Sequence, residues 1–109
     1  MIPHGVDIYF GLDPIDLRWG FERLTGIVQE RLGRRARDGA LFVFFGKHRA
    51  ALKILYFDGS GLCLFYKRLD RGTFRPPTSL DEHATLVELD ERTLEDLLAG
   101  VDVVTPTKH

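Results

Sequence analysis

The sequence predicts a single α+β domain, in which an antiparallel β-meander sheet of about five to six strands packs against one long N-terminal helix, with a short C-terminal helix. Three observations support this prediction: an alternating segment at residues 6–12, a helical apolar stripe at 17–32, and apolar runs separated by short turns over 41–75. The chain has 109 residues, of which 44% are hydrophobic, so one core is expected. We assign residues 1–104 to this domain and 105–109 to a flexible tail.

A strand and then a helix are expected at the start of the chain. Apolar and other residues alternate over residues 6–12, which is typical of a half-buried strand. Asp13 is a suitable N-cap, Pro14 fits the first helical position, and Gly33 is a natural C-cap. The intervening apolar residues, at steps of four and three, form the stripe that we expect to face the sheet: Leu17, Phe21, Leu24, Val28 and Leu32.

Further strands are expected in the middle of the chain. Gly, Asp and Arg residues at 46–49, 58–61 and 70–72 predict turns. Because these connections are short, neighbouring strands are expected to pair in an antiparallel meander. The predicted strands span residues 41–45, 52–57, 62–69 and a short edge segment, 73–75, closed by two prolines.

A last strand and a short helix are expected in the final third. Residues 85–89 alternate as a strand does, and Asp90 is a suitable N-cap for the helix that follows. Leucines on one side of that helix predict a buried face, and Gly100 predicts its end.

The composition indicates in which compartment the protein is expected to be found. No apolar run approaches the roughly 18 residues that a membrane span needs, so no membrane partner is expected. The N-terminal segment lacks both a basic region and an apolar signal core. Cys63 is the only cysteine, which excludes an internal disulfide and favours a cytoplasmic protein.

No catalytic residue, metal ligand or cofactor is expected. The four histidines, at positions 4, 48, 83 and 109, lack the close spacing of a zinc site. Cys63 lies between leucines in a predicted strand, where a buried inert thiol is expected. Asp58 and Asp70 occupy turn positions that favour Asp for local hydrogen bonds. The sequence therefore predicts a protein that is not an enzyme and has no evident small-molecule substrate.

Charge is distributed unevenly along the chain. The formal net charge is −1, yet residues 18–77 contain thirteen Lys or Arg against five Asp or Glu. Residues 78–109 contain two against eight. This asymmetry suggests either a basic surface that meets an anionic partner or an acidic segment that folds back and neutralises the basic one.

Cations interleaved with aromatics in the predicted hairpins are candidates for contacts with DNA phosphates, and Tyr66 and Phe74 for stacking on bases. The alternative is a solvated rim over an aromatic core. The near-neutral net charge also counts against strong non-specific DNA binding. The candidate DNA-binding residues are Lys47, Arg49, Lys53, Lys67, Arg68, Arg71 and Arg75.

Arg18 and Trp19 are candidates for binding a protein partner. Both lie off the apolar stripe of the predicted first helix. An exposed tryptophan often anchors an interface, although Trp19 could equally flank the core.

Two long blocks resemble the TnpB accessory protein of insertion sequence 66 transposons: MIPHGVDIYFGLDPIDLRWGFERL and LFVFFGKHRAALKILYFDGSGLCLFYKRLDRGTF. The resemblance is close over residues 1–77 and general beyond them. Matching positions include Asp16, Arg18, Gly20, Phe21, Leu41 to Phe44, Lys53, Ile54, Leu55, Tyr56, Asp58, Gly59, Gly61, Tyr66, Lys67, Arg68, Leu69, Arg71, Gly72 and Phe74.

Departures from the family pattern affect the charged hairpin. Trp19 stands where the family often has a basic residue, and residues 46–51 contain fewer cations than the family's arginine-rich stretch. Phe57 and Leu64 replace tryptophans. If the family's hairpin holds DNA by charge, this chain is expected to hold it more weakly.

The resemblance implies a bacterial, non-catalytic accessory role in transposition, beside a separate transposase encoded by the same element. Two hypotheses follow. In the first, the basic hairpins bind DNA, with the transposon ends as the expected target. In the second, the chain is a protein–protein adaptor that docks on the co-encoded transposase or other element proteins without contacting DNA.

Overall fold

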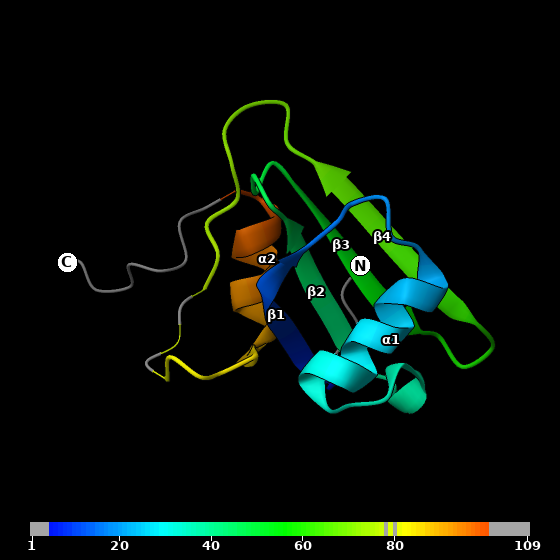
Figure 1. Cartoon of the computed structure of the whole chain (residues 1–109). Helices are drawn as coiled ribbons and strands as arrows, with labels where there is room; N and C mark the ends of the chain where they lie inside the picture. The colour runs from blue at the N-terminus through cyan, green and yellow to red at the C-terminus, as the bar shows by residue number, and fades with distance from the viewer. Residues whose placement is uncertain (1–4, 78, 80, 101–109) are drawn as a thin grey trace.

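The protein is described by a computed structural model that covers residues 5–77, 79 and 81–100 (Figure 1). The predicted tail at 105–109 lies outside this range. A five-stranded sheet with the strand order β4-β3-β2-β1-β5 forms the centre. The elements are β1 (Ile8–Ile15), α1 (Phe21–Leu32), the 3-10 turn η1 (Ala36–Asp38), β2 (Leu41–Gly46), β3 (Ala51–Phe57), β4 (Leu62–Arg68), β5 (Leu86–Leu89) and α2 (Glu91–Leu98).

The α+β class is confirmed, but the sheet is mixed and the prediction of a purely antiparallel meander was wrong. Strands β1 and β2 run parallel, with Ile8 opposite Leu41 and Phe10 opposite Val43. The connection between them contains α1, which gives the chain enough length to return to the starting end of the sheet. The short turns after β2 and β3 produce the expected antiparallel pairs of β2 with β3 and β3 with β4.

Helix α1 starts later than predicted and is not a long N-terminal helix. Strand β1 continues to Ile15, and α1 spans only 12 residues, from Phe21, with Gly20 rather than Asp13 at its N-cap. Gly33 is the C-cap, as predicted, with a left-handed φ of 67°. The buried face consists of Leu24, Ile27, Val28 and Leu32, so the predicted stripe is correct in its second half.

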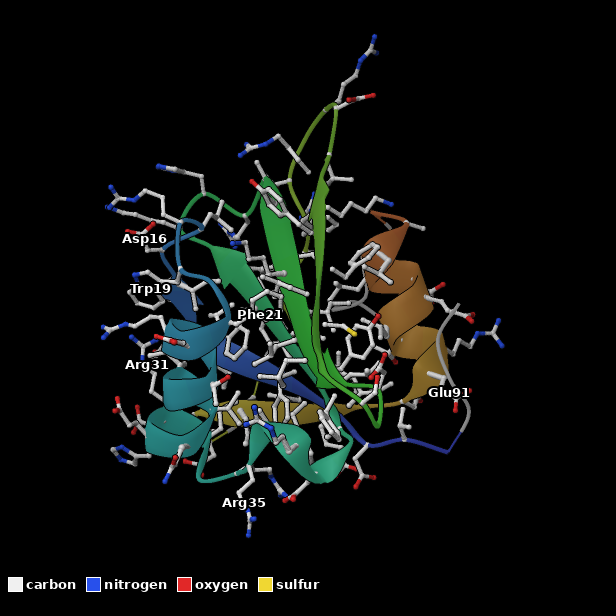
Figure 2. The ribbon with its side chains drawn as sticks, turned by 90° about the vertical axis from the view of Figure 1, so that its right-hand side faces the viewer. Asp16, Trp19, Phe21, Arg31, Arg35 and Glu91 are labelled. Atoms are coloured by element: carbon white, nitrogen blue, oxygen red, sulfur yellow. The ribbon has the colours of Figure 1, made fainter. Side chains whose placement is uncertain are left out.

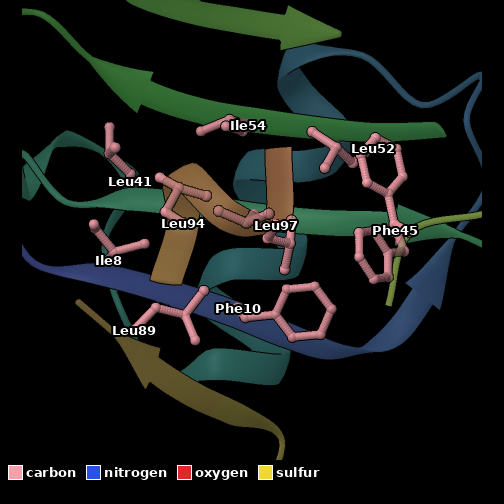
Figure 3. Close-up of a cluster of buried hydrophobic side chains, with 11 residues drawn as sticks. Ile8, Phe10, Leu41, Phe45, Leu52, Ile54, Leu89, Leu94 and Leu97 are labelled. Carbon is pink, nitrogen blue, oxygen red and sulfur yellow. The ribbon is translucent and has the colours of Figure 1, made fainter. Parts of the chain in front are cut away.

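The two helices cover opposite faces of the sheet, as the edge-on view shows (Figure 2). The α2-side core places Leu94 and Leu97 over Ile8 and Phe10 (Figure 3). In the α1-side core, Leu24 and other residues of α1 pack against the side chains that the same strands direct to the opposite face of the sheet. Tyr9, which alternates with Ile8 and Phe10 along β1, is therefore buried with the α1-side core, and β1 is buried on both faces rather than on one.

The predicted edge strand at 73–75 does not form. Phe74 is fully buried in the α2-side core instead, where its ring stacks on that of Phe45 with centroids 5.4 Å apart. Strand β5 occupies the edge of the sheet beside β1, with Leu89 opposite Ile8. Asp90 caps α2 as predicted, since its Oδ1 accepts a 2.7 Å hydrogen bond from the Thr93 N–H.

Among the described residues, no helix has the length and apolar character that crossing a bilayer requires.

Candidate nucleic-acid interface

Three segments meet at the end of the sheet where β1 and β2 finish: residues 13–19, which include the irregular end of β1, the turn 47–50 after β2, and residues 68–75, which begin at the last residue of β4. Backbone hydrogen bonds hold the last two together. The Leu69 N–H donates to the Ala50 carbonyl at 2.9 Å, and the Phe74 N–H donates to the Arg49 carbonyl at 2.7 Å. The turn and the loop therefore form one rim.

This rim is rich in cations. The three segments contain six Lys or Arg and three Asp. Lys47, Arg49 and Arg68 line an open groove that also receives Pro14 and Ile15 from β1. Arg71 and Arg75 are exposed in the adjoining loop. We call the following set the basic edge: Arg18, Lys47, Arg49, Arg68, Arg71 and Arg75.

The structure separates Lys53 from the other predicted DNA-binding cations. Its side chain is only 8% exposed and lies on the α1 face of β3. The ammonium Nζ donates a 2.8 Å hydrogen bond to the Trp19 carbonyl and lies 5.3 Å from the centre of the Tyr66 ring. Lys53 thus holds the loop between β1 and α1 against the sheet and has little surface to offer a phosphate.

Lys67 is also separated from the basic edge. It lies opposite Leu52 and therefore points to the α2 face, whereas Lys53 and Arg68 point to the α1 face. Its Nζ donates a 2.8 Å hydrogen bond to the Leu98 carbonyl at the end of α2. This contact satisfies a terminal carbonyl of the helix.

Arg18 lies at the basic edge beside the carboxylate of Asp16. Its side chain forms a two-point ion pair with Asp16, with nitrogen–oxygen distances of 3.0 and 2.6 Å. The hydrogen bonds from the Arg18 side chain and backbone lower the pKa of Asp16 from 3.8 to about 2. Asp16 is therefore ionised at neutral pH, and it cancels part of the positive charge at this corner.

Trp19 belongs to the loop before α1, not to the helix as predicted. It is partly buried and packs against the α1-side core. The guanidinium carbons of Arg23 and Arg31 lie 4.7 and 5.7 Å from the ring centre. Because Trp19 lies outside α1, the helical spacing of four does not account for its contact with Arg23. Trp19 thus joins two helix cations to the core, and Figure 2 shows it beside α1, near Asp16.

The two aromatics proposed to stack on bases differ in exposure. Phe74 is fully buried, so its expected role in stacking was wrong. Tyr66 is 49% exposed, and its hydroxyl accepts a 2.9 Å hydrogen bond from the Arg68 guanidinium.

The residues considered for catalysis do not gather. No group of three or more His, Cys, Asp or Glu could hold a metal ion within the described ranges. The Asp58 carboxylate accepts hydrogen bonds from the Ser60 and Gly61 backbones, which lower its pKa to about 2 and account for its place in the turn. Cys63 is partly exposed rather than buried.

The histidines are placed only in part. His48 lies in the β2–β3 turn and His83 in the loop before β5, while positions 4 and 109 fall outside the described residues.

An acidic groove lies at the opposite end of the sheet from the basic edge. It runs along α2 where β5 meets the start of β1, and Figure 2 shows Glu91 and Asp16 at opposite corners. In the described part of the chain, ion pairs join Asp16 with Arg18 and Arg35 with Asp38, and neither pair crosses to the acidic segment. The groove is lined by Val6, Glu88, Leu89, Asp90, Glu91, Arg92, Glu95 and Asp96.

The fold and this edge define a small α+β protein with a mixed sheet and a group of six cations at one end of that sheet. A family model described as IS66 Orf2-like protein matches residues 6–108. The chain therefore belongs to the IS66 Orf2-like family, TnpB_IS66, which confirms the resemblance seen in the sequence. This family comprises accessory proteins of IS66 elements and is not a known catalytic family. Membership associates the chain with transposition of such elements.

Two similar proteins come from Sinorhizobium fredii. The uncharacterized protein y4hO is 39% identical over 104 residues, which cover 94% of this chain and 88% of that protein. The uncharacterized protein y4jC is 35% identical over 98 residues, covering 90% of this chain and 81% of that protein. No solved structure matches the chain.

Proposed function

We propose that this chain serves IS66-type transposition by holding DNA through the phosphate backbone along the basic edge. The observation that carries this proposal is the gathering of exposed cations on the rim formed by the β2–β3 turn and the loop after β4. Within the part of the basic edge that the structure describes, Arg18 forms an ion pair, and its partner is Asp16. The other five are Lys47, Arg49, Arg68, Arg71 and Arg75.

Cations of this kind favour binding that is insensitive to base sequence. Each phosphate that a Lys or Arg neutralises releases condensed counterions, so affinity falls steeply as salt rises. Contacts to phosphates orient a protein on the duplex but do not read the bases. Since Phe74 is buried and Tyr66 bonds to Arg68, the edge offers little for base readout. We expect transposon-end DNA to be held with slight sequence preference.

The test replaces three exposed cations of the edge by glutamine. The variant is Lys47→Gln/Arg71→Gln/Arg75→Gln, and its matched control is Arg35→Gln/Arg37→Gln/Arg92→Gln, which removes the same charge from other exposed positions. Binding to a transposon-end duplex is measured by fluorescence anisotropy at several salt concentrations. The edge variant is expected to reduce the slope of log affinity against log salt by about one for each lost phosphate contact.

Two results would contradict DNA binding through this edge. One is the absence of any complex between the wild-type protein and the duplex at low salt. The other is an equal loss of affinity in the edge variant and its control, which would reflect net charge rather than the position of the cations.

The adaptor function is the alternative, and the acidic groove beside α2 favours it. Five carboxylate residues and one arginine line that groove, so it suits a basic segment of the co-encoded transposase. The adaptor is favoured if the wild-type protein captures the transposase without DNA. This capture should be weakened by Glu88→Gln/Glu95→Gln but not by the control Glu22→Gln/Glu30→Gln. Trp19→Ala tests whether the loop before α1 also takes part.

A further inference from the structure

Strand β4 is a long outer strand of the sheet. It pairs with β3 over all seven of its residues in an unbroken register, and it ends the strand order on that side. Its sequence, LCLFYKR, contains no proline, and its cations occupy only the last two positions. Natural proteins usually shield such an edge with charge, proline or a bulge, because it offers backbone groups to another strand. The central part of β4 lacks this protection.

The register shows which backbone groups of β4 face outward. The Asp58 N–H donates to the Gly61 carbonyl, and the Leu69 N–H donates to the Ala50 carbonyl. In an antiparallel ladder, hydrogen-bonded pairs alternate with pairs that are not bonded. Positions 63, 65 and 67 of β4 therefore bond to β3. The N–H and C=O groups that point away from the sheet belong to Leu62, Leu64, Tyr66 and Arg68.

Apolar side chains border this edge on the α1 face. Tyr66 on β4 is 49% exposed and Phe21 at the start of α1 is 46% exposed, and these are the large hydrophobic residues that stand out from the described surface. Helix α1 packs against β3 and β4. Figure 2, in which the β4 side of the sheet faces the viewer, shows Phe21 projecting from α1 toward it. The backbone edge and an apolar flank thus occur together.

Charge favours a second copy of the same strand in the antiparallel direction. The cations Lys67 and Arg68 lie at one end of β4, and the carboxylate of Asp58 lies in the turn at its other end. Antiparallel pairing brings the basic end of each strand to the acidic turn of the other. Parallel pairing would place cation beside cation, which is unfavourable.

We propose that two copies of this chain associate by antiparallel pairing of their β4 strands, centred on Phe65. Position 65 then faces itself, Leu64 faces Tyr66 of the second copy, and Leu62 faces its Arg68. This register pairs all four outward residues with one another. The exposed Tyr66 ring is covered by an apolar neighbour, and the two sheets become continuous.

The first test measures the association of the DNA-free protein by sedimentation equilibrium. The wild type is expected to show a monomer–dimer equilibrium. Tyr66→Pro removes an outward N–H without removing a bond to β3, so the dimer is expected to weaken by about 30-fold or more. Tyr66→Ala is the matched control, because it also loses the ring but keeps the N–H, and it should weaken the dimer less. A urea transition establishes that each variant is folded.

The second test examines the register directly. In the proposed pairing the two Phe65 positions form a non-hydrogen-bonded pair, with Cα atoms about 4.5 Å apart, which suits a disulfide. Phe65→Cys in a Cys63→Ser background is expected to yield a disulfide-linked dimer under mild oxidation. Thr73→Cys in the same background, in the loop after β4, should remain largely unlinked.

Specific outcomes would overturn the proposal. These are a wild type that stays monomeric at high micromolar concentration, a folded Tyr66→Pro variant that dimerises as the wild type does, and a Phe65→Cys variant that links no better than Thr73→Cys. If Tyr66→Pro does not fold, the cysteine pair decides. Because both tests omit DNA, they stand apart from the salt-dependence experiment above.

Discussion

Lys53 shows how a single side chain positions a loop. It is buried on the α1 face of β3, yet its ammonium group reaches the Trp19 carbonyl at 2.8 Å. A buried cation is tolerated only where such polar partners exist. The face of the Tyr66 ring, 5.3 Å away, adds a second favourable contact. Lys53 thereby links the centre of the sheet to the corner that presents Arg18.

Lys53→Met should destabilise the protein. Methionine preserves the apolar stem but leaves the Trp19 carbonyl without its donor, so we expect the free energy of unfolding to fall by about 1–2 kcal/mol. Urea denaturation measures this change. Lys47→Met, at an exposed turn position, is the control and should change stability by less than about 0.5 kcal/mol. Equal stability of Lys53→Met and the wild type would show that the hydrogen bond is not stabilising.

At this scale the sequence identified the cations but not where each one points. The turn at 58–61 predicts the β3–β4 hairpin, and its register places Lys53 opposite Tyr66 and Lys67 opposite Leu52, on different faces. Alternation alone could therefore have separated these two lysines. The burial of Lys53 was not foreseeable, because it depends on a loop that packs from elsewhere in the chain.

At the scale of the elements, α1 begins later than the local sequence pattern predicts. Asp13 and Pro14 have the chemistry of a helix start, but they lie within β1, whose pairing with β2 shifts between Gly11 and Ile15. Proline is tolerated at such an irregularity because its missing N–H breaks no regular ladder bond. Local propensity therefore suggested a helix where the parallel ladder, a contact between distant residues, kept the chain extended.

Two glycines in neighbouring elements should respond oppositely to alanine. Gly26→Ala lies inside α1, where the added Cβ meets the Glu30 carboxylate at an ordinary contact distance of 4.0 Å, and it is expected to stabilise the protein by about 0.5–1 kcal/mol. Gly11→Ala places a Cβ 2.7 Å from the buried Phe44 ring and should destabilise it by about 1–3 kcal/mol. Thermal and urea unfolding measure both. A stabilised Gly11→Ala variant would contradict the tight packing of β1 on β2.

The mixed topology shows what short-range patterns can and cannot predict. Short turns correctly predicted the β2–β3 and β3–β4 hairpins. The parallel pairing of β1 with β2 follows a connection that contains a helix, so strand–helix–strand order was the available signal. The pairing of β5 with β1 joins residues far apart in the sequence, and no local pattern indicates it.

At the scale of the molecule, the basic edge and the acidic groove occupy opposite ends of the sheet, although Arg34 and Arg35 are exposed at the end where β1 begins. The basic edge lies where β1 and β2 finish, and the acidic groove lies where β5 ends beside the start of β1. The near-neutral net charge of −1 conceals this separation. A cluster of exposed cations such as the basic edge attracts a polyanion to that part of the surface even when the net charge is close to zero.

The whole fold should require β5 and α2. A chain that ends at Thr85 loses Leu89, Leu94 and Leu97 from the α2-side core. Burial of three leucines is worth about 5–9 kcal/mol, which is comparable to the whole stability of a small domain. Circular dichroism and urea titration should show no cooperative transition for this variant, whereas a chain ending at Gly100 should retain one. A cooperative transition in the shorter chain would contradict this requirement.

The position of β5 in the sequence also determines when the sheet can be completed during synthesis. Strand β1 emerges early but obtains its outer neighbour only after the final third of the chain has been translated, since Ile8 pairs with Leu89. Until then the outer edge of β1 has no partner strand, and the phenylalanines of the α2-side core are not covered by α2. Nascent chains on neighbouring ribosomes of one messenger RNA would therefore be most prone to aggregate shortly before their synthesis is finished.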